Sequence, residues 1–306
     1  MIDLKIQIPD GFLEEEVRCD YLVTSHMKEV WAVMLDLLVE FDRVCKIYGL
    51  KYFASGGTLL GAVRHRGFIP WDDDIDLMML REDYDKLLEI GPREFRNPFF
   101  FQSKFTDPSA NDLLVKIRNS ETTSLFKAEK KCALPYNKGI FIDVFPLDNV
   151  PDNQIVRRNY FEVLEAKRQM IIKYGRTIGI YSASENTISM LIKNTLYHLL
   201  KWRRNVCINN YLQLIAEYES LCAKYSGENT EFVASFVYGP KENLFRSKSD
   251  LIDCMDFDFE FVKVPVCSGY HHYLTDAFGD YMKFVRGTSW HSELFFDTNN
   301  GYKDYR

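Results

Sequence analysis

Four aspartates fall within five positions, at Asp72, Asp73, Asp74 and Asp76, and lead directly into an apolar run. In a strand, Asp72, Asp74 and Asp76 would share one face, with neighbours about 6.5–7 Å apart. Carboxylates that close repel one another, and burial raises the cost, so they need protonation, basic partners or a cation. Mg²⁺ is commonly held by one or two carboxylates plus substrate phosphates. The stretch predicts a site for a metal-bound phosphate compound; the alternative is a solvated acidic turn before an ordinary strand.

Adjacent glycines stand upstream of these aspartates and interrupt a second apolar run. Gly56 and Gly57, followed by Thr58, predict a close backbone approach to a ligand, as in other glycine-bearing phosphate loops. Arg64 and Arg118 are candidates to pair with phosphate oxygens, because a guanidinium binds them in a planar, bidentate way. We therefore expect these five residues to contact the phosphate groups of the substrate.

A third carboxylate interrupts the apolar run from Ile140 to Phe145, at Asp143. A carboxylate within a core strand needs a partner. Asp143 could pair with a structural arginine, or it could join Asp74 and Asp76 as a metal ligand or catalytic base. Either Asp72 or Asp143 could accept the proton of an attacking hydroxyl, and the sequence does not choose between them.

Helices and strands alternate around these residues. Apolar positions at helical spacing predict a helix over 21–48 that stops at Gly49. Beyond it we expect strands at 51–55, 75–80, 98–105 and 113–118, and helices at 58–65 and 81–90, the latter closed by Gly91-Pro92. Near the end we expect a strand at 232–238, another over 257–266, and a helix at 270–278 capped by Gly279. The alternation indicates an α/β or α+β sheet domain.

Composition bounds the class of protein. The chain has 306 residues, 46% of them hydrophobic, a net charge of −6 and seven cysteines without a Cys-x-x-Cys pair. The charge argues against a general nucleic-acid binder, and the cysteines fit reduced thiols. The N-terminus lacks a signal-peptide pattern, and no window approaches 18 uninterrupted apolar residues. We expect a soluble cytoplasmic protein.

Three regions differ in character along the chain. We expect a catalytic core with its N-terminal helix over 1–150, a basic helical insert over 151–230, and a C-terminal region over 231–306 that packs back on the core. Between 151 and 225 the insert has eleven Lys/Arg against six Asp/Glu. Its stretch 190–204 combines apolar bulk, a tryptophan and adjacent arginines, which suits either a helix lying on an anionic membrane or an ordinary packed helix.

The glycine turn, short helix and Asp-x-Asp strand have the arrangement of the nucleotidyltransferase fold, the polymerase beta superfamily. The interval from Gly57 to Asp76 closely resembles the signature of the LicD family, bacterial phosphocholine transferases with fukutin and fukutin-related protein as distant relatives. Residues 139–148 resemble that family's second block. Residues 264–282 resemble its C-terminal block, after which a histidine such as His291 commonly follows.

This resemblance implies an α+β nucleotidyltransferase-like core with a largely helical insert. It also implies a transferase that moves a phospho-alcohol, phosphocholine first among them, from a CDP-activated donor to a hydroxyl of a teichoic acid, lipopolysaccharide or capsule precursor. Carried over by position, Asp74, Asp76 and Asp143 would hold Mg²⁺ or Mn²⁺, and His291 would join the donor site. Contact with the inner membrane surface would accompany a lipid-linked acceptor.

Other functions remain open on the same residues. The chain could act on CDP-ribitol or CDP-glycerol, or it could transfer the NMP half of a nucleotide donor. A third possibility is a scaffold of a surface-glycan pathway that binds a nucleotide without turnover. Asp74 and Asp76 argue against that last possibility.

Overall fold

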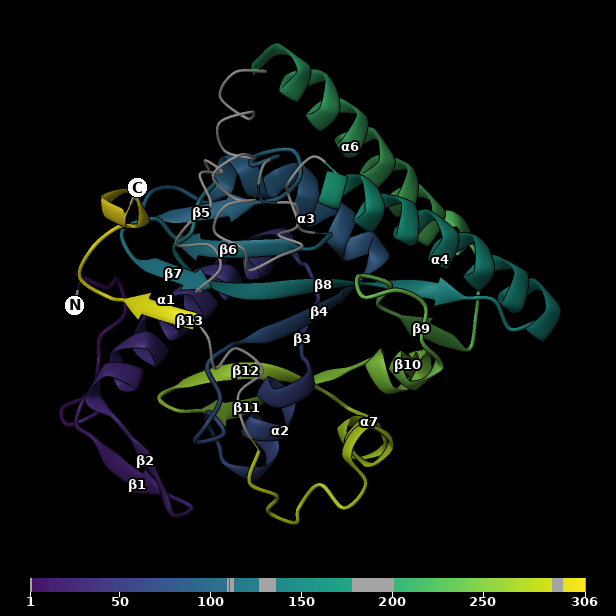
Figure 1. Ribbon diagram of the computed structural model, residues 1–306. Coiled ribbons are helices and arrows are strands. Elements are labelled where there is room, and N and C mark those ends of the chain that lie inside the picture. Colours follow the sequence, from purple (N-terminus) through teal and green to yellow (C-terminus); the bar gives the residue numbers. More distant parts are fainter. Residues whose placement is uncertain are drawn as a thin grey trace.

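A mixed seven-stranded β-sheet organises the chain, and its longest strand is β8 (Ile140–Val150). The computed structural model describes residues 2–108, 110, 113–126, 136–177, 201–287 and 294–305. Strand β8 pairs in parallel with β4 (Asp76–Leu80) and antiparallel with β6 (Val115–Asn119) and β9 (Phe232–Ala234) (Figure 1). The remaining strands of this sheet are β3 (Phe53–Ala54), β5 (Phe99–Gln102) and β10 (Phe245–Ser247). Helices around a mixed sheet confirm the predicted α+β class.

Successive side chains of these strands point to opposite faces of the sheet, and both faces are largely covered, since every residue of β8 except Phe145 is buried. Ile142 and Val144 of β8 and Leu77 of β4 are fully buried. Helices α1 (Ser25–Tyr48) and α3 (Arg81–Glu94) pack against these strands. The residues between the apolar ones point the other way, because successive strand side chains alternate faces. That opposite face carries the candidate site.

Helix α1 has clear signals at both ends. The Thr24 side chain accepts a hydrogen bond from the Met27 N–H, and Gly49 closes the helix in the left-handed region at φ 62°. The predicted stop at Gly49 is confirmed, but the predicted start at Tyr21 is wrong. Tyr21–Val23 instead forms β2, which pairs with β1 (Glu16–Arg18) as a hairpin.

The predicted end of α3 at Gly91-Pro92 is also wrong, because the helix continues to Glu94. Pro92 lies in the last turn, where its missing N–H costs a single hydrogen bond. A Cβ on Gly91 would lie 2.3 Å from the Phe101 ring of β5. This glycine therefore permits close packing of helix on sheet and does not end the helix.

The remaining elements lie around the seven-stranded sheet. Helices α4 (Gln154–Thr177) and α6 (Lys201–Cys222) lie side by side over a separate apolar cluster that includes Tyr160 and Tyr211 (Figure 1). Strands β11 (Cys254–Phe259) and β12 (Val262–Cys267) form a hairpin, where a single strand over 257–266 was predicted. Helix α7 (Tyr270–Phe278) forms as predicted, and β13 (Leu294–Asp297) pairs with β7 (Thr123–Phe126). Helix α2 is Gly56–Arg64. Short 3-10 turns lie at Ala223–Tyr225, Glu242–Leu244, Lys248–Leu251 and Tyr302–Tyr305.

Within the described ranges, none of the helices combines the length and the apolar character that crossing a membrane requires.

Candidate active site

Three charged side chains lie in a row across neighbouring strands of the sheet. Asp76, the first residue of β4, is the register partner of Asp143 on β8, and Asp143 is in turn the partner of Lys116 on β6. Register partners on adjacent strands lie about 5 Å apart and share a face. The Lys116 Nζ donates to Asp143 Oδ1 at 2.5 Å and lies 4.1 Å from the centre of the Phe141 ring. Two carboxylates and one ammonium therefore form a continuous line.

Negative charge is in excess at Asp76. Burial raises the pKa of its carboxyl, and the charges of Asp74, Asp143 and Asp72 raise it further, while Lys116 acts in the opposite direction. The pKa of Asp76 therefore lies well above its ordinary value. Several carboxylates converging with one opposing ammonium form a site that would gain from a divalent cation.

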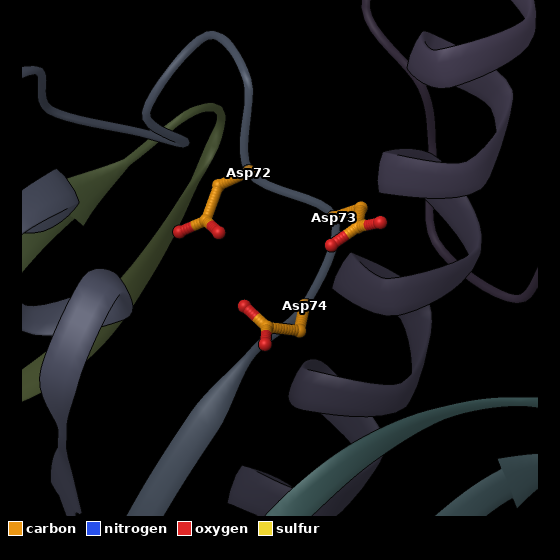
Figure 2. Close-up of side chains that lie close together, drawn as sticks. All are labelled: Asp72, Asp73 and Asp74. Carbon is orange, nitrogen blue, oxygen red and sulfur yellow. The ribbon is translucent and has the colours of Figure 1, made fainter. Parts of the chain in front are cut away.

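The other acidic residues lie on the loop before β4. Figure 2 shows Asp72, Asp73 and Asp74 side by side on this loop, and one carboxylate oxygen from each lies within 4.8 Å of the others. The predicted strand face shared by Asp72, Asp74 and Asp76 is wrong, because the strand begins only at Asp76. A turn from the Asp72 N–H to the Ile69 carbonyl, and a 3.0 Å hydrogen bond from Trp31 Nε1 to the Asp72 carbonyl, hold the loop instead.

The oxygens of the three loop aspartates suit a hard divalent cation such as Mg²⁺, because they come from carboxylates and lie within 4.8 Å of one another. Asp73, which the sequence argument did not assign, belongs to this group and is buried. Asp74, Asp76 and Asp143 as the ligand set stays a prediction, and the loop adds Asp72 and Asp73 as further oxygen donors in reach.

The double glycine begins helix α2, beside the carboxylates. Gly56 has φ 51°, in the left-handed region that favours glycine. A Cβ on Gly57 would lie 2.5 Å from Asp72 Oδ2. Thr58 Oγ1 accepts the Asp76 N–H at 2.8 Å, which ties the first turn of α2 to the start of β4. The backbone conformation thus favours a glycine at position 56, and the close approach of Asp72 favours one at position 57.

Tyr273 of α7 contacts the same turn, and although it belongs to the C-terminal block that resembles the LicD family, the sequence predicted no role for it. Its hydroxyl accepts the Gly56 N–H at 3.2 Å and shares a 3.0 Å hydrogen bond with Ser55 Oγ. The Arg246 guanidinium lies 4.1 Å from the centre of the Tyr273 ring. A C-terminal helix thus positions the N-terminus of α2, and only the tertiary contact reveals it.

The two predicted phosphate-binding arginines have partners within the protein. Arg64 Nη1 donates to the Tyr281 carbonyl at 2.7 Å. Arg64 lies seven residues after Gly57, which is about 10 Å along the axis of α2. Arg118 donates to Gln102 Oε1 and to the Gly139 carbonyl, and it stacks at 4.6 Å on Phe141. Arg118 shares the sheet face of Asp143, whereas Arg64 is directed to the C-terminal segment.

His291 lies outside the described residues, as do residues 178–200 of the insert predicted over 151–230. Lys116 is the most informative residue that the sequence argument did not assign. A signal for it was present, because Lys116 and Arg118 alternate with Val115 and Ile117 and so put two cations on one face. The strand that carries the matching carboxylate could not be known without the sheet register.

Comparisons with known proteins locate the resemblance on the same elements. Residues 49–173 match the family model for the LicD/FKTN/FKRP nucleotidyltransferase domain. The lipopolysaccharide cholinephosphotransferase LicD of Haemophilus influenzae is 28% identical over 264 residues, which cover 84% of this chain and 91% of that protein. Human ribitol 5-phosphate transferase FKRP is 50% identical over 40 residues, which cover 13% of this chain and 8% of that protein.

Proposed function

We infer that this chain, which carries a LicD-family domain over residues 49–173, is a phosphotransferase that moves a phospho-alcohol to a hydroxyl acceptor. The similarity to a cholinephosphotransferase over most of both chains and the local similarity to a ribitol 5-phosphate transferase support this class of reaction. The observation that carries the proposal in the structure is the register pairing of Asp76 with Asp143 beside the first turn of α2.

We propose a CDP-linked alcohol as donor, phosphocholine as the group transferred, and a glycan precursor such as lipopolysaccharide as acceptor. Phosphocholine is favoured because the cholinephosphotransferase relative aligns over 91% of its own length. CDP-ribitol and CDP-glycerol remain alternative donors. A polymerase beta-like core and a cytoplasmic location, peripheral at the membrane, complete the proposal.

In the proposed reaction, the acceptor hydroxyl oxygen forms a bond to the phosphorus that bears the alcohol. The bond from that phosphorus to the bridging oxygen breaks, and CMP leaves with the bridging oxygen. Mg²⁺ bound by Asp74, Asp76 and Asp143 would neutralise charge on the diphosphate oxygens. A carboxylate accepts the hydroxyl proton.

Asp143 and Asp72 are the candidates for that proton. The Lys116 Nζ donates to Asp143 Oδ1, which leaves Oδ2 of the same carboxylate available to a substrate hydroxyl. Asp72 lies against the first turn of α2, where a Cβ on Gly57 would come within 2.5 Å of its Oδ2. Lys116 thus orients the Asp143 carboxylate, and the first turn of α2 lies against the Asp72 carboxylate.

The test incubates the protein with Mg²⁺ and one CDP-alcohol at a time, with a glycan acceptor, and measures released CMP. We expect CMP release that EDTA abolishes and that Asp76→Asn lowers at least ~10²-fold, because the variant weakens the metal site. Asp258→Asn is the matched control, since Asp258 is exposed and forms its salt bridge with Lys263 at the surface. Turnover by Asp76→Asn at the wild-type rate would contradict the assignment.

The alternatives give different products in this assay. CMP attached to the acceptor would indicate nucleotidyl transfer instead of phospho-alcohol transfer. Nucleotide binding without any product from the whole donor panel, together with intact glycan modification in cells carrying Asp74→Ala, would indicate a scaffold.

A further inference from the structure

We propose that the segment Phe278–Arg286, here called the 278–286 loop, docks this protein onto an anionic lipid surface. It follows α7 and runs along the lower edge of the molecule to beneath α2 (yellow in Figure 1). Four large apolar side chains in it are exposed: Phe278 by 47%, Met282 by 55%, Phe284 by 53% and Val285 by 69%. Single exposed apolar residues are ordinary, but four within one short loop mark an interaction surface.

The charges between these apolar side chains select the partner. Lys283 and Arg286 are exposed and lie next to Phe284 and Val285, and the loop has one acidic residue, Asp280. A basic, apolar surface is unusual on a chain with a net charge of −6. Apolar side chains flanked by cations suit the boundary between anionic headgroups and acyl chains.

The loop is held in place and is not a loose excursion of the chain. Arg64 Nη1 donates to the carbonyls of Tyr281 at 2.7 Å and Lys283 at 3.3 Å. The Arg64 guanidinium lies 5.0 Å from the centre of the Phe284 ring, and the Tyr281 hydroxyl bonds His271 Nδ1 at 2.8 Å. These contacts fix the loop through the buried Tyr281 and through Arg64, while Met282 and Val285 are exposed to solvent.

Arg64 thereby acquires a role other than phosphate binding. It stands at the C-terminal end of α2, whose N-terminal end lies beside Asp72 and Asp76. Because the helix is rigid, a membrane bound by the loop would lie at a defined distance from the carboxylates. The loop would orient the site toward an acceptor that is held in the same membrane.

A second copy of this chain is a less suitable occupant. In a two-fold symmetric contact the same patch faces itself, so Lys283 and Arg286 would approach their own copies. That arrangement brings like charges together around an apolar centre. An anionic bilayer satisfies the apolar side chains and the cations at once.

The test measures co-sedimentation of the full chain, without donor or metal, with vesicles of phosphatidylcholine alone or mixed with phosphatidylglycerol. We expect binding to the anionic vesicles, a loss of at least ~10-fold in partitioning for Val285→Glu, and about 5-fold for Arg286→Gln. Ile155→Glu is the matched control, because Ile155 is 74% exposed in the first turn of α4, outside the 278–286 loop. Because binding is read without turnover, the result does not depend on the proposed transferase function.

Three results would overturn the proposal. One is wild-type protein that does not bind anionic vesicles. Another is Val285→Glu and Met282→Glu that both bind like wild type, which would assign the contact to another surface such as the basic insert. The third is a dimer in solution that Val285→Glu dissociates, which would assign the loop to self-association. A melting temperature for Val285→Glu equal to that of wild type shows that the variant is folded.

Discussion

The two ends of the β4–β8 strand pair differ in how their charged side chains are paired. At the amino end, Asp76 faces Asp143, acid beside acid, with Lys116 on the far side. Just beyond the carboxyl end of β4, Arg81 binds Asp148 through two hydrogen bonds of 2.7 and 2.8 Å, and Asp148 is almost completely buried. Burial alone would lower the pKa of Arg81, but the hydrogen bond and the charge of Asp148 raise it above its ordinary value.

This difference separates a structural ion pair, Arg81–Asp148, from the carboxylates of the candidate active site. The Arg81–Asp148 pair is matched in charge and in hydrogen-bond geometry, so it needs no ligand. The carboxylates around Asp76 repel one another, and folding alone does not relieve that repulsion. A stretch of sheet that keeps an excess of one charge is therefore the better candidate for binding a metal and a substrate.

The largest effect on stability is expected at the Arg81–Asp148 pair. Arg81→Met leaves Asp148 buried without its partner and should lower the free energy of unfolding by about 3–5 kcal/mol. Chemical denaturation measures the loss. The double variant Arg81→Met/Asp148→Leu should recover most of it, because no uncompensated charge remains. A single variant within about 1 kcal/mol of wild type would break the comparison.

At the other end, Asp143→Asn should lower CMP release at least ~10²-fold even per folded molecule, and it should also lower the free energy of unfolding, because it takes the charged partner from the buried Lys116 ammonium. Asp148→Asn on the same strand is the matched variant. It should lower stability and leave the rate per folded molecule within about 2-fold of wild type, since Asp148 pairs with Arg81 and not with the Asp76 row. Equal rate losses in the two variants would remove the distinction.

Lys116 is expected to have an intermediate effect on the rate. Lys116→Met removes the hydrogen bond that orients Asp143, and kcat should fall about 10-fold with a smaller change in KM. Lys116→Arg keeps the charge and should stay within about 3-fold of wild type. If the Arg variant lost as much as the Met variant, packing against Phe141 would be the role of Lys116.

The smallest expected effect is a gain in stability. Without metal, Asp76→Asn removes a repelling charge and should stabilise the fold by about 1 kcal/mol. The pKa of Asp76 is raised in the folded state, so the wild type is penalised above that pKa and the penalty fades as the pH falls through it. Thermal unfolding in EDTA at several pH values should therefore show the largest difference at high pH. A variant less stable than wild type at high pH would contradict the repulsion.

Local signals were sufficient for much of the fold. Helix α7 follows from its apolar spacing and the glycine after it, and the stop of α1 follows from Gly49. Gly91-Pro92 misled because a glycine also serves close packing, here against Phe101. The run 72–76 misled because hydrogen bonds to the Ile69 carbonyl and from Trp31, distant in sequence, keep Asp72 out of the strand.

The sequence by itself determined which residues could do chemistry: carboxylates before and within apolar strands, a double glycine, and a motif shared with the LicD family. It could not determine which residues face one another, since the partner of a strand residue depends on sheet register. Only the tertiary structure decided that Asp143 lies between Asp76 and Lys116, that Tyr273 holds the glycine turn, and that Arg64 serves the 278–286 loop. These contacts join residues far apart in the chain, and the packing of the whole sheet sets them.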